Sequence, residues 1–372
     1  GRRRPRAQAL TRQPLILLPL LLAGLHLQGA EPLTAPPAEA GRLPRENLLR
    51  CYDRQGRETR VRSRQDWLRR RAEILRGMET VMGPMPGREK EVPLDVRIES
   101  EQDEGAFVLQ RLTYASEPGC RVPAFLLIPK APSGAGKRLP AVLALHSTDM
   151  QYGHRVLVEP LRAYFRAYAR ELAERGFVVL APAYPLMADY QPDLRALGYH
   201  SGTMKAIWDN RRGLDLLDSL PFVRKGRYGA LGHSLGGHNA IYTAVFEPRI
   251  VAVVSSCGFD SFLDYKEGDI RGWTSERYMP RLLEYRNCLD RIPFDFHELI
   301  GALAPRRVFI NAPLRDDNFN WRSVDRIVRA AAPVFELYRV PRHLRVQHPD
   351  CGHDFPPDVR EAAYAFLRES LQ

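Results

Sequence analysis

The sequence predicts an α/β fold, in which a mostly parallel sheet carries helices on both faces. From about residue 141 to the end of the chain, short apolar runs alternate with segments of helical spacing. The runs are apolar throughout, as at 141–145, which is typical of parallel strands buried on both faces. A strand followed by a helix, repeated several times, requires the crossover connections of such a sheet.

Each element is predicted from its own pattern. The helix expected at 64–82 carries Trp67, Ile74 and Met78 on one face and ends at Gly83-Pro84. Three strands bounded by turn residues precede the alternating region. The expected strands are 94–98, 107–114, 122–128, 141–145, 177–181, 227–231, 250–254, 308–310 and 344–346. The other expected helices are 161–174, 202–220, 236–246, 324–337 and 357–371.

The net charge of +11 is concentrated near the N-terminus. Residues 1–90 carry 19 basic and 9 acidic side chains, whereas residues 91–372 carry 36 and 35. The body of the chain is therefore electrically balanced, and no nucleic-acid partner is expected. The five cysteines show no CxxC or Cys/His spacing, so no metal and no cofactor are expected, and free thiols are favoured.

The first 30 residues predict a signal peptide. Five arginines within residues 1–12 precede an apolar run at 15–25, and Gly29-Ala30 follow. Pro19 interrupts the run, which is shorter than the roughly 20 residues that span a bilayer. We therefore expect export to the periplasm or the medium, without membrane association after cleavage; an uncleaved anchor is the alternative. Residues 31–60 are expected to be a linker and N-terminal extension.

The strongest local motif is Gly232-His233-Ser234-Leu235-Gly236-Gly237. It follows an apolar strand and begins a helix, which is the context of a nucleophile elbow, where a tight turn lifts a serine hydroxyl above the sheet. Glycines on both sides of the serine let the strand and the helix approach each other. Ser234 is therefore the expected nucleophile.

A serine nucleophile needs a base, and in this architecture the chain order is serine, acid, histidine. The histidines after Ser234 are His297, His343, His348 and His353. His353 lies in a loop between the last strand and the final helix, so it can bend back over the sheet edge. We expect His353 to be the base and His348, nearer the strand end, to be structural.

The acid is expected in the loop that follows the strand at 308–310. That loop contains two candidates, Asp316 and Asp317. Asp316 is favoured because an apolar residue, Phe319, follows it at the third position and can anchor the loop. Asp317 is the alternative; otherwise it is expected to hydrogen-bond the backbone near Asn318.

The oxyanion of an acyl-transfer reaction needs two backbone N–H donors. One is expected from Leu235, directly after the nucleophile. The other is expected from the loop after the strand at 141–145, with Thr148 as the first choice and Ser147 as the second.

Five segments together resemble a known family. They are LALHSTD at 143–149, SGTMKAIWDNRRGLDLLDSLP at 201–221, LGHSLGGHNAIYTAVFEPRI at 231–250, NAPLRDDNF at 311–319 and DCGHDFPPDVREAAYAFL at 350–367. From about residue 60 to residue 372 the chain resembles α/β-hydrolases of the dienelactone hydrolase and acetyl-xylan-esterase-like groups, which are exported bacterial proteins. The resemblance implies an eight-stranded, mostly parallel sheet, a Ser-Asp-His triad and carboxylic-ester hydrolysis.

The chain departs from this family at two positions. Ser147 stands where many members have glycine, so the expected oxyanion loop departs from the family pattern at this position. Ser234 stands where dienelactone hydrolases have cysteine, which argues against dienelactones as substrates. Residues 61–372 are expected to form one catalytic domain. The segment 260–303 is too long for a simple connection between strands and is expected to be a helical insertion.

The expected function is that of a serine esterase acting on short-acyl or carbohydrate-linked esters. The expected partner is a small-molecule or carbohydrate ester. The insertion and the helix at 64–82 are expected near the mouth of the active site, where they would determine substrate choice. One alternative is a serine peptidase of the same fold, although no propeller-sized extra domain is present. The other is a non-catalytic, hydrolase-like surface protein.

Aromatic side chains offer a possible sugar-binding cleft, since carbohydrates stack on aromatic faces. The candidates are Trp208, Trp273, Trp321, Tyr184, Tyr190 and Tyr278. Because aromatic residues make up 9% of the chain, core packing is expected to account for most of these positions.

Overall fold

The computed structural model describes residues 42–53, 55–130, 138–159 and 167–372. The expected signal peptide lies outside these residues. So do the first part of the expected linker and residues 161–166 of the helix expected at 161–174. No helix in the described part of the chain is long and apolar enough to cross a membrane.

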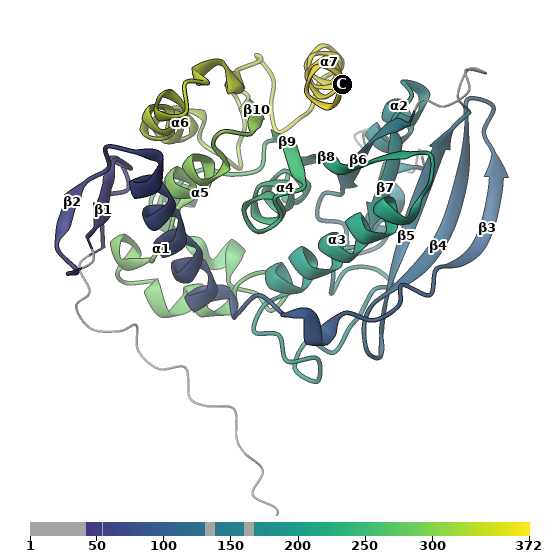
Figure 1. Ribbon diagram of the computed structural model, residues 1–372, viewed down its shortest axis with the longest axis horizontal. Helices are drawn as coiled ribbons and strands as arrows, with labels where there is room; N and C mark the ends of the chain where they lie inside the picture. The colour runs from purple at the N-terminus through teal and green to yellow at the C-terminus, as the bar shows by residue number, and fades with distance from the viewer. Residues whose placement is uncertain (1–41, 54, 131–137, 160–166) are drawn as a thin grey trace, which may run out of the picture. The chain divides into compact units, whose positions relative to one another are not determined.

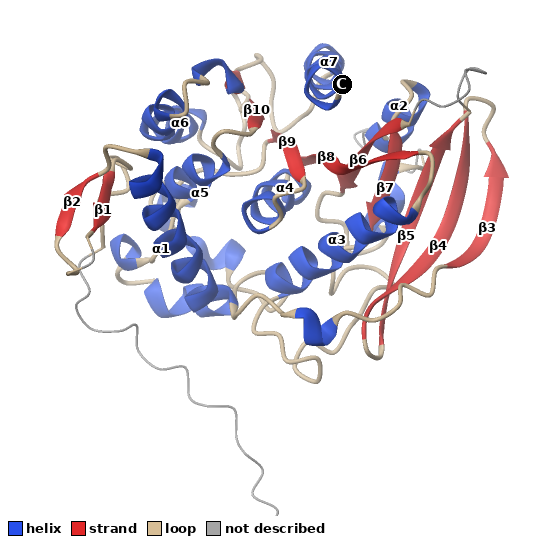
Figure 2. Cartoon of the chain, in the orientation of Figure 1, coloured by secondary structure: helices blue, strands red, loops and turns tan. Residues whose placement is uncertain are grey.

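In the described part of the chain, nine strands form the central sheet. Figures 1 and 2 show this sheet with helices packed around it. The strands are β3 (Arg97–Asp103), β4 (Phe107–Glu117), β5 (Cys120–Pro129), β6 (Leu139–Leu145), β7 (Val178–Pro182), β8 (Val223–His233), β9 (Ile250–Ser256), β10 (Arg307–Asn311) and β11 (Leu344–Gln347). Their order is β11-β10-β9-β8-β6-β7-β5-β4-β3. The strands from β6 to β11 run parallel, and β3, β4 and β5 join by antiparallel pairing.

The sheet confirms the predicted fold class but corrects the strand number implied by the resemblance, which is eight. The ninth strand is the edge strand β3, all of whose residues are exposed. The strand expected at 94–98 is displaced, because Asp95 has a positive φ of 40° and breaks the extended run. β3 instead begins at Arg97 and pairs with β4 through its backbone, although its sequence is polar.

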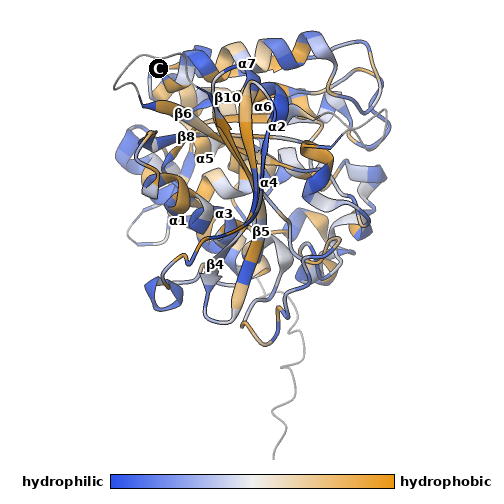
Figure 3. Cartoon of the chain, turned by 90° about the vertical axis from the view of Figure 1, so that its right-hand side faces the viewer, coloured by the Kyte–Doolittle hydropathy of each residue, from blue (hydrophilic) through white to orange (hydrophobic). Residues whose placement is uncertain are grey.

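Helices cover both faces of the sheet. They are α1 (Arg64–Met82), α2 (Tyr168–Glu174), α3 (Gly202–Ser219), α4 (Leu235–Phe246), α5 (Phe296–Leu303), α6 (Trp321–Leu337) and α7 (Pro357–Leu371). One cluster of buried apolar side chains joins α3, α4 and α6 to the sheet. A second cluster joins α2 and α7 to it. Figure 3 shows the apolar residues along the central strands and the polar residues along the outer face of α7.

The segment between β9 and β10 contains the insertion. It was expected to be helical over 260–303, but only its last eight residues form an α-helix, α5. The rest consists of short 3₁₀ turns, and Lys266 and Glu267 have positive φ angles of 46° and 58° that prevent a continuous helix. Pro280 and Pro293 add further interruptions, since proline has no backbone N–H to donate.

The N-terminal part of the described chain packs against this insertion. Arg45 donates to Asp295 at 2.7 Å, and Arg70 of α1 donates to Glu298 of α5 at 3.1 Å. Two short strands in this region, β1 (Arg50–Tyr52) and β2 (Glu58–Arg60), pair antiparallel and were not predicted from the sequence. The helix α1 therefore packs against the insertion, and it lies beside α5 in Figure 1.

Candidate active site

Ser234 occupies a tight turn between β8 and α4. Its backbone has φ 54° and ψ −122°, a conformation that an L-residue adopts only under constraint. A Cβ atom on Gly232 would lie 2.2 Å from the backbone carbon of Gly236, and one on Gly236 would lie 1.9 Å from the Leu145 carbonyl oxygen. Only glycine therefore allows β8, β6 and α4 to approach this closely, and the turn presents the Ser234 hydroxyl at the carboxyl end of the sheet.

The structure brings Ser234, His353 and Asp316 together. His353 Nε2 lies 3.0 Å from Ser234 Oγ. On the other side of the ring, Nδ1 lies 2.9 Å and 3.0 Å from the two carboxylate oxygens of Asp316. This is the connected arrangement of nucleophile, base and orienting acid that nucleophilic catalysis requires.

Asp316 and Asp317 differ sharply in their surroundings. The Asp316 side chain is 1% exposed and accepts hydrogen bonds from the amides of Asn318 and Phe319 at 2.8 and 3.1 Å. Burial opposes ionisation of this carboxyl, but His353 and the two amides outweigh it and hold its pKa below the ordinary value. Asp317 is exposed. The backbone bonds expected of Asp317 are thus made by Asp316, so that expectation was wrong.

The loop after β6 is hydrogen-bonded to the turn that carries Ser234 and to the insertion. His146 is buried, which lowers its pKa to about 4, and its Nε2 accepts from the Tyr184 amide at 2.9 Å. Ser147 Oγ donates to the His233 carbonyl at 3.0 Å, and Thr148 Oγ1 lies 2.9 Å from Tyr278 OH. These bonds hold residues 146–148 beside the turn that carries Ser234.

The insertion reaches the triad through aromatic contacts. Trp273 lies with its ring centroid 6.1 Å from that of Phe319, and the Phe319 ring lies 5.9 Å from the His353 ring. Lys266 Nζ donates to the Asp317 carbonyl at 2.7 Å. Together with the Tyr278–Thr148 contact, these interactions place the insertion next to both the acid loop and the loop at 146–148. The helix α1 packs on α5 and on the turn at 280–285 of the insertion.

The other sequence candidates lie elsewhere. Trp208 is fully buried and donates to the Ser116 carbonyl, whereas Trp321 packs on His348. Tyr190 donates to the buried carboxylate of Asp209. Of the six aromatic residues considered for a sugar cleft, Trp273, Tyr278 and Tyr184 contact the loops at 146–148 and 311–319.

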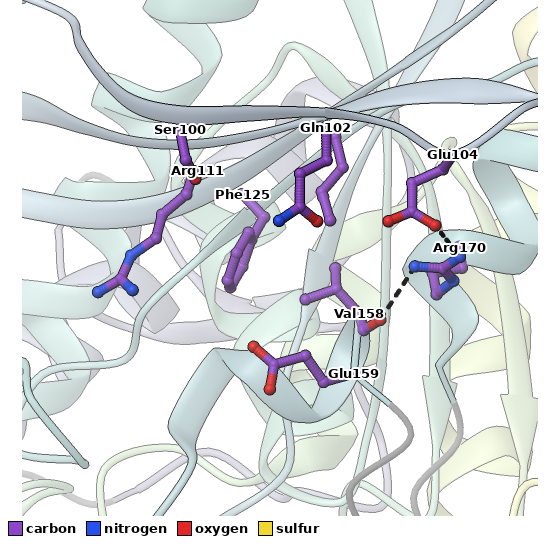
Figure 4. A pocket seen from close by; sticks show the side chains of 9 residues that line it. Ser100, Gln102, Glu104, Arg111, Phe125, Val158, Glu159 and Arg170 are labelled. Carbon is purple, nitrogen blue, oxygen red and sulfur yellow. Dashed lines mark hydrogen bonds and ion pairs between the residues drawn. The ribbon is translucent and has the colours of Figure 1, made fainter.

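A surface pocket of about 400 Å³ lies away from the triad, between the β3–β5 end of the sheet and the start of α2 (Figure 4). Its charged side chains already have partners. Arg170 donates to Glu104 at 2.6 Å, and Arg111 pairs with Glu99 at 3.0 Å.

Asp260 is a buried carboxyl near the acid loop that no motif in the sequence marks. It is 3% exposed, its Oδ2 accepts from the Asn320 amide at 3.0 Å, and its Oδ1 has no donor among the described residues. Burial, together with the nearby charges of Asp264, Asp295 and Asp316, raises its pKa to about 8. Asp260 is therefore protonated in the folded protein at neutral pH.

The variant Asp260→Asn should gain stability over wild type as the pH rises. The folded carboxyl keeps its proton up to about pH 8, whereas the unfolded chain releases it near about pH 4. The folded state thus binds more protons in this window, and the free energy of unfolding of wild type falls across it. Melting curves at about pH 5 and about pH 8 measure this effect. A Tm difference between variant and wild type that stays constant would contradict it.

Comparison with known proteins gives distant relatives and a common fold. No family model matches the chain. The Bacillus subtilis protein named "Putative hydrolase YtaP" is 25% identical over 313 residues, which cover 81% of this chain and all of that protein. A 4-O-methyl-glucuronoyl methylesterase of Phanerochaete carnosa is 26% identical over 197 residues, covering 46% of this chain and 48% of the methylesterase. The latter match therefore spans about half of each protein.

Two solved esterase structures share the architecture. The glucuronoyl esterase from Solibacter usitatus has a TM-score of 0.70 at 18% identity and covers 90% of this chain and 99% of its own. Acetyl xylan esterase 1 from Thermoanaerobacterium sp. has a TM-score of 0.52 at 18% identity and covers 81% of this chain and 93% of its own. At these identities the similarity establishes the fold, and at that level it confirms the resemblance predicted from the motifs.

Proposed function

We propose that this chain, which has the α/β-hydrolase fold, is a serine hydrolase that cleaves carboxylic esters of carbohydrates. The observation that carries the proposal is the continuous contact from Ser234 Oγ through the His353 ring to the buried Asp316 carboxylate. A scaffold without catalysis has no need to keep a serine in a strained turn next to a histidine with a buried acid behind it.

In the proposed reaction Ser234 attacks the acyl carbon while His353 Nε2 accepts the hydroxyl proton. The Asp316 carboxylate holds the ring in the tautomer that carries hydrogen on Nδ1 and stabilises the imidazolium that forms. The amide of Leu235, the first residue of α4, has no acceptor within the helix and is available to the oxyanion together with the amide of Thr148. Protonated His353 then protonates the leaving alcohol and afterwards activates a water that hydrolyses the acyl-enzyme.

Two observations support carbohydrate esters as the substrate class. A sequence relative matched over about half of its length is named as a 4-O-methyl-glucuronoyl methylesterase. Solved structures matched over most of their length are named as a glucuronoyl esterase and an acetyl xylan esterase. The insertion brings the buried side chains of Trp273 and Tyr278 into contact with the loops around Ser234 and His353, so the insertion borders the place where the substrate would bind. We propose export through the N-terminal signal sequence, which suits a polysaccharide substrate, with no nucleic-acid or membrane partner.

A fluorophosphonate probe and a panel of esters test this function. The probe should label the wild-type chain at Ser234. If the protein were a non-catalytic scaffold, Ser234 would remain unlabelled. The panel contains p-nitrophenyl esters of increasing acyl length, methyl esters of glucuronic acid, acetylated xylan and peptide anilides. We expect hydrolysis of the sugar esters and of short acyl chains. Faster cleavage of anilides would identify a peptidase, and a maximum beyond about ten acyl carbons would identify a lipase.

A further inference from the structure

Cys257 lies beside the triad, although the reaction proposed above does not use it. It follows β9 directly, has a positive φ of 48° and is 2% exposed. One ligand atom each from Cys257, Asp316 and His353 lie within 4.8 Å of one another. Over the described ranges of the chain, this is the one group of three such side chains close enough together to hold a metal ion.

We propose that Cys257, Asp316 and His353 form an inhibitory binding site for a divalent zinc ion. Thiolate, imidazole and carboxylate together are a donor set that zinc binds well and that magnesium and calcium do not. Ligands at about 2.0–2.3 Å from a tetrahedral zinc ion lie about 3.3–3.8 Å from one another. The widest of these separations exceeds that spacing by no more than about 1.5 Å, whereas His353 Nδ1 and the Asp316 oxygen, at 2.9 Å, need to move slightly apart. Small side-chain rotations supply both changes.

His353 is the most exposed of the three proposed ligands. The side chains of Cys257 and Asp316 are buried, whereas that of His353 is 25% exposed. The ion enters from the His353 side, and a water takes the fourth position there. The Cys257 thiol donates to the Asp354 carbonyl at 3.3 Å, a contact that zinc binding would replace.

Zinc at this site removes the catalytic base. In the resting triad His353 Nδ1 carries the hydrogen and faces Asp316, which leaves Nε2 free to accept from Ser234. When zinc occupies Nδ1, the ring hydrogen moves to Nε2 through solvent, and the Cys257 thiol proton is released to solvent. Nε2 then has no lone pair for the Ser234 proton, so hydrolysis stops.

The test uses the purified full chain and zinc chloride. The inhibition rests on the proposed function, but binding is measured separately by titration calorimetry. Wild type should bind one zinc ion per chain and lose ester hydrolysis in parallel, and EDTA should restore the activity. Equal concentrations of magnesium or calcium should have no effect.

Cys257→Ser and Cys257→Ala are the decisive variants, and both should keep the basal activity. The zinc concentration for half-inhibition should rise at least about tenfold in each, because even groups outside the ligand shell contribute that much to metal affinity. The matched control is Cys351→Ser, at a half-exposed cysteine two residues before His353, and it should keep wild-type sensitivity.

Equal zinc affinity in wild type and both Cys257 variants would overturn the site. So would a wild type that hydrolyses esters but binds no zinc. An inactive wild type that binds zinc through Cys257 would instead refute the proposed function and leave the site standing. If either Cys257→Ser or Cys257→Ala fails to fold, the zinc affinity of the other variant tests the site.

Discussion

Replacing Ser234 with alanine should reduce ester hydrolysis by about 10⁶-fold, because the reaction then lacks its nucleophile. The fold should survive, since the strain of the turn lies in the backbone at 232–236 and alanine is smaller than serine. Removing a β-hydroxyl from a residue with φ 54° adds no clash. Initial rates on a short-chain p-nitrophenyl ester, measured beside a thermal melt, give both quantities.

The matched control is Ser219→Ala, in the last turn of α3, whose hydroxyl donates only to the Leu216 carbonyl. It should retain wild-type rates. Residual hydrolysis above about one tenth of wild type in Ser234→Ala, with the fold intact, would show that another group attacks the ester.

Replacing Asp316 with asparagine should lower turnover by about 10⁴-fold at neutral pH. The amide presents an N–H where the carboxylate accepts from His353, which favours the ring tautomer with hydrogen on Nε2. That tautomer cannot accept the Ser234 proton. The expected loss is therefore in kcat, while labelling of the folded chain slows without disappearing.

The neighbouring variant Asp317→Asn is the control for this prediction. Its side chain is exposed, and the ordered contact at residue 317 is made by its carbonyl oxygen with Lys266. Its turnover should remain within about threefold of wild type, as for a surface substitution. A larger loss in Asp317→Asn than in Asp316→Asn would transfer the role of the acid to Asp317.

Most strands and helices could be predicted because their signals are local. Apolar runs such as 141–145 and 250–254 are found as β6 and β9, and α1 spans the predicted 64–82. The elements that were misjudged depend on partners remote in the chain. The polar segment 97–103 forms strand β3 because its backbone hydrogen-bonds to β4. The insertion folds as short turns because it packs on α1 and on the loop that contains Asp316 and Asp317.

The candidate site was predictable to a similar extent. A serine turn between a closely packed strand and helix requires glycine at positions such as Gly232 and Gly236. The motif and its position between a strand and a helix therefore predict Ser234 as the nucleophile. His353 could be selected from the chain order. Asp260 and Cys257 carried no comparable signal, because nothing in the residues around them indicates burial beside Asp316.

The sequence by itself determined the fold class, the nucleophile turn and the position of the histidine loop, since these follow from hydrophobic periodicity and from steric limits on a few adjacent residues. Only the tertiary structure decided which aspartate faces His353, because the direction of a side chain in a loop depends on bonds such as those from the Asn318 and Phe319 amides. It also decided that Cys257 lies within reach of the triad. That proximity arises where β9 and the loops at 311–319 and 350–355 meet, and such a meeting depends on packing between segments far apart in the chain.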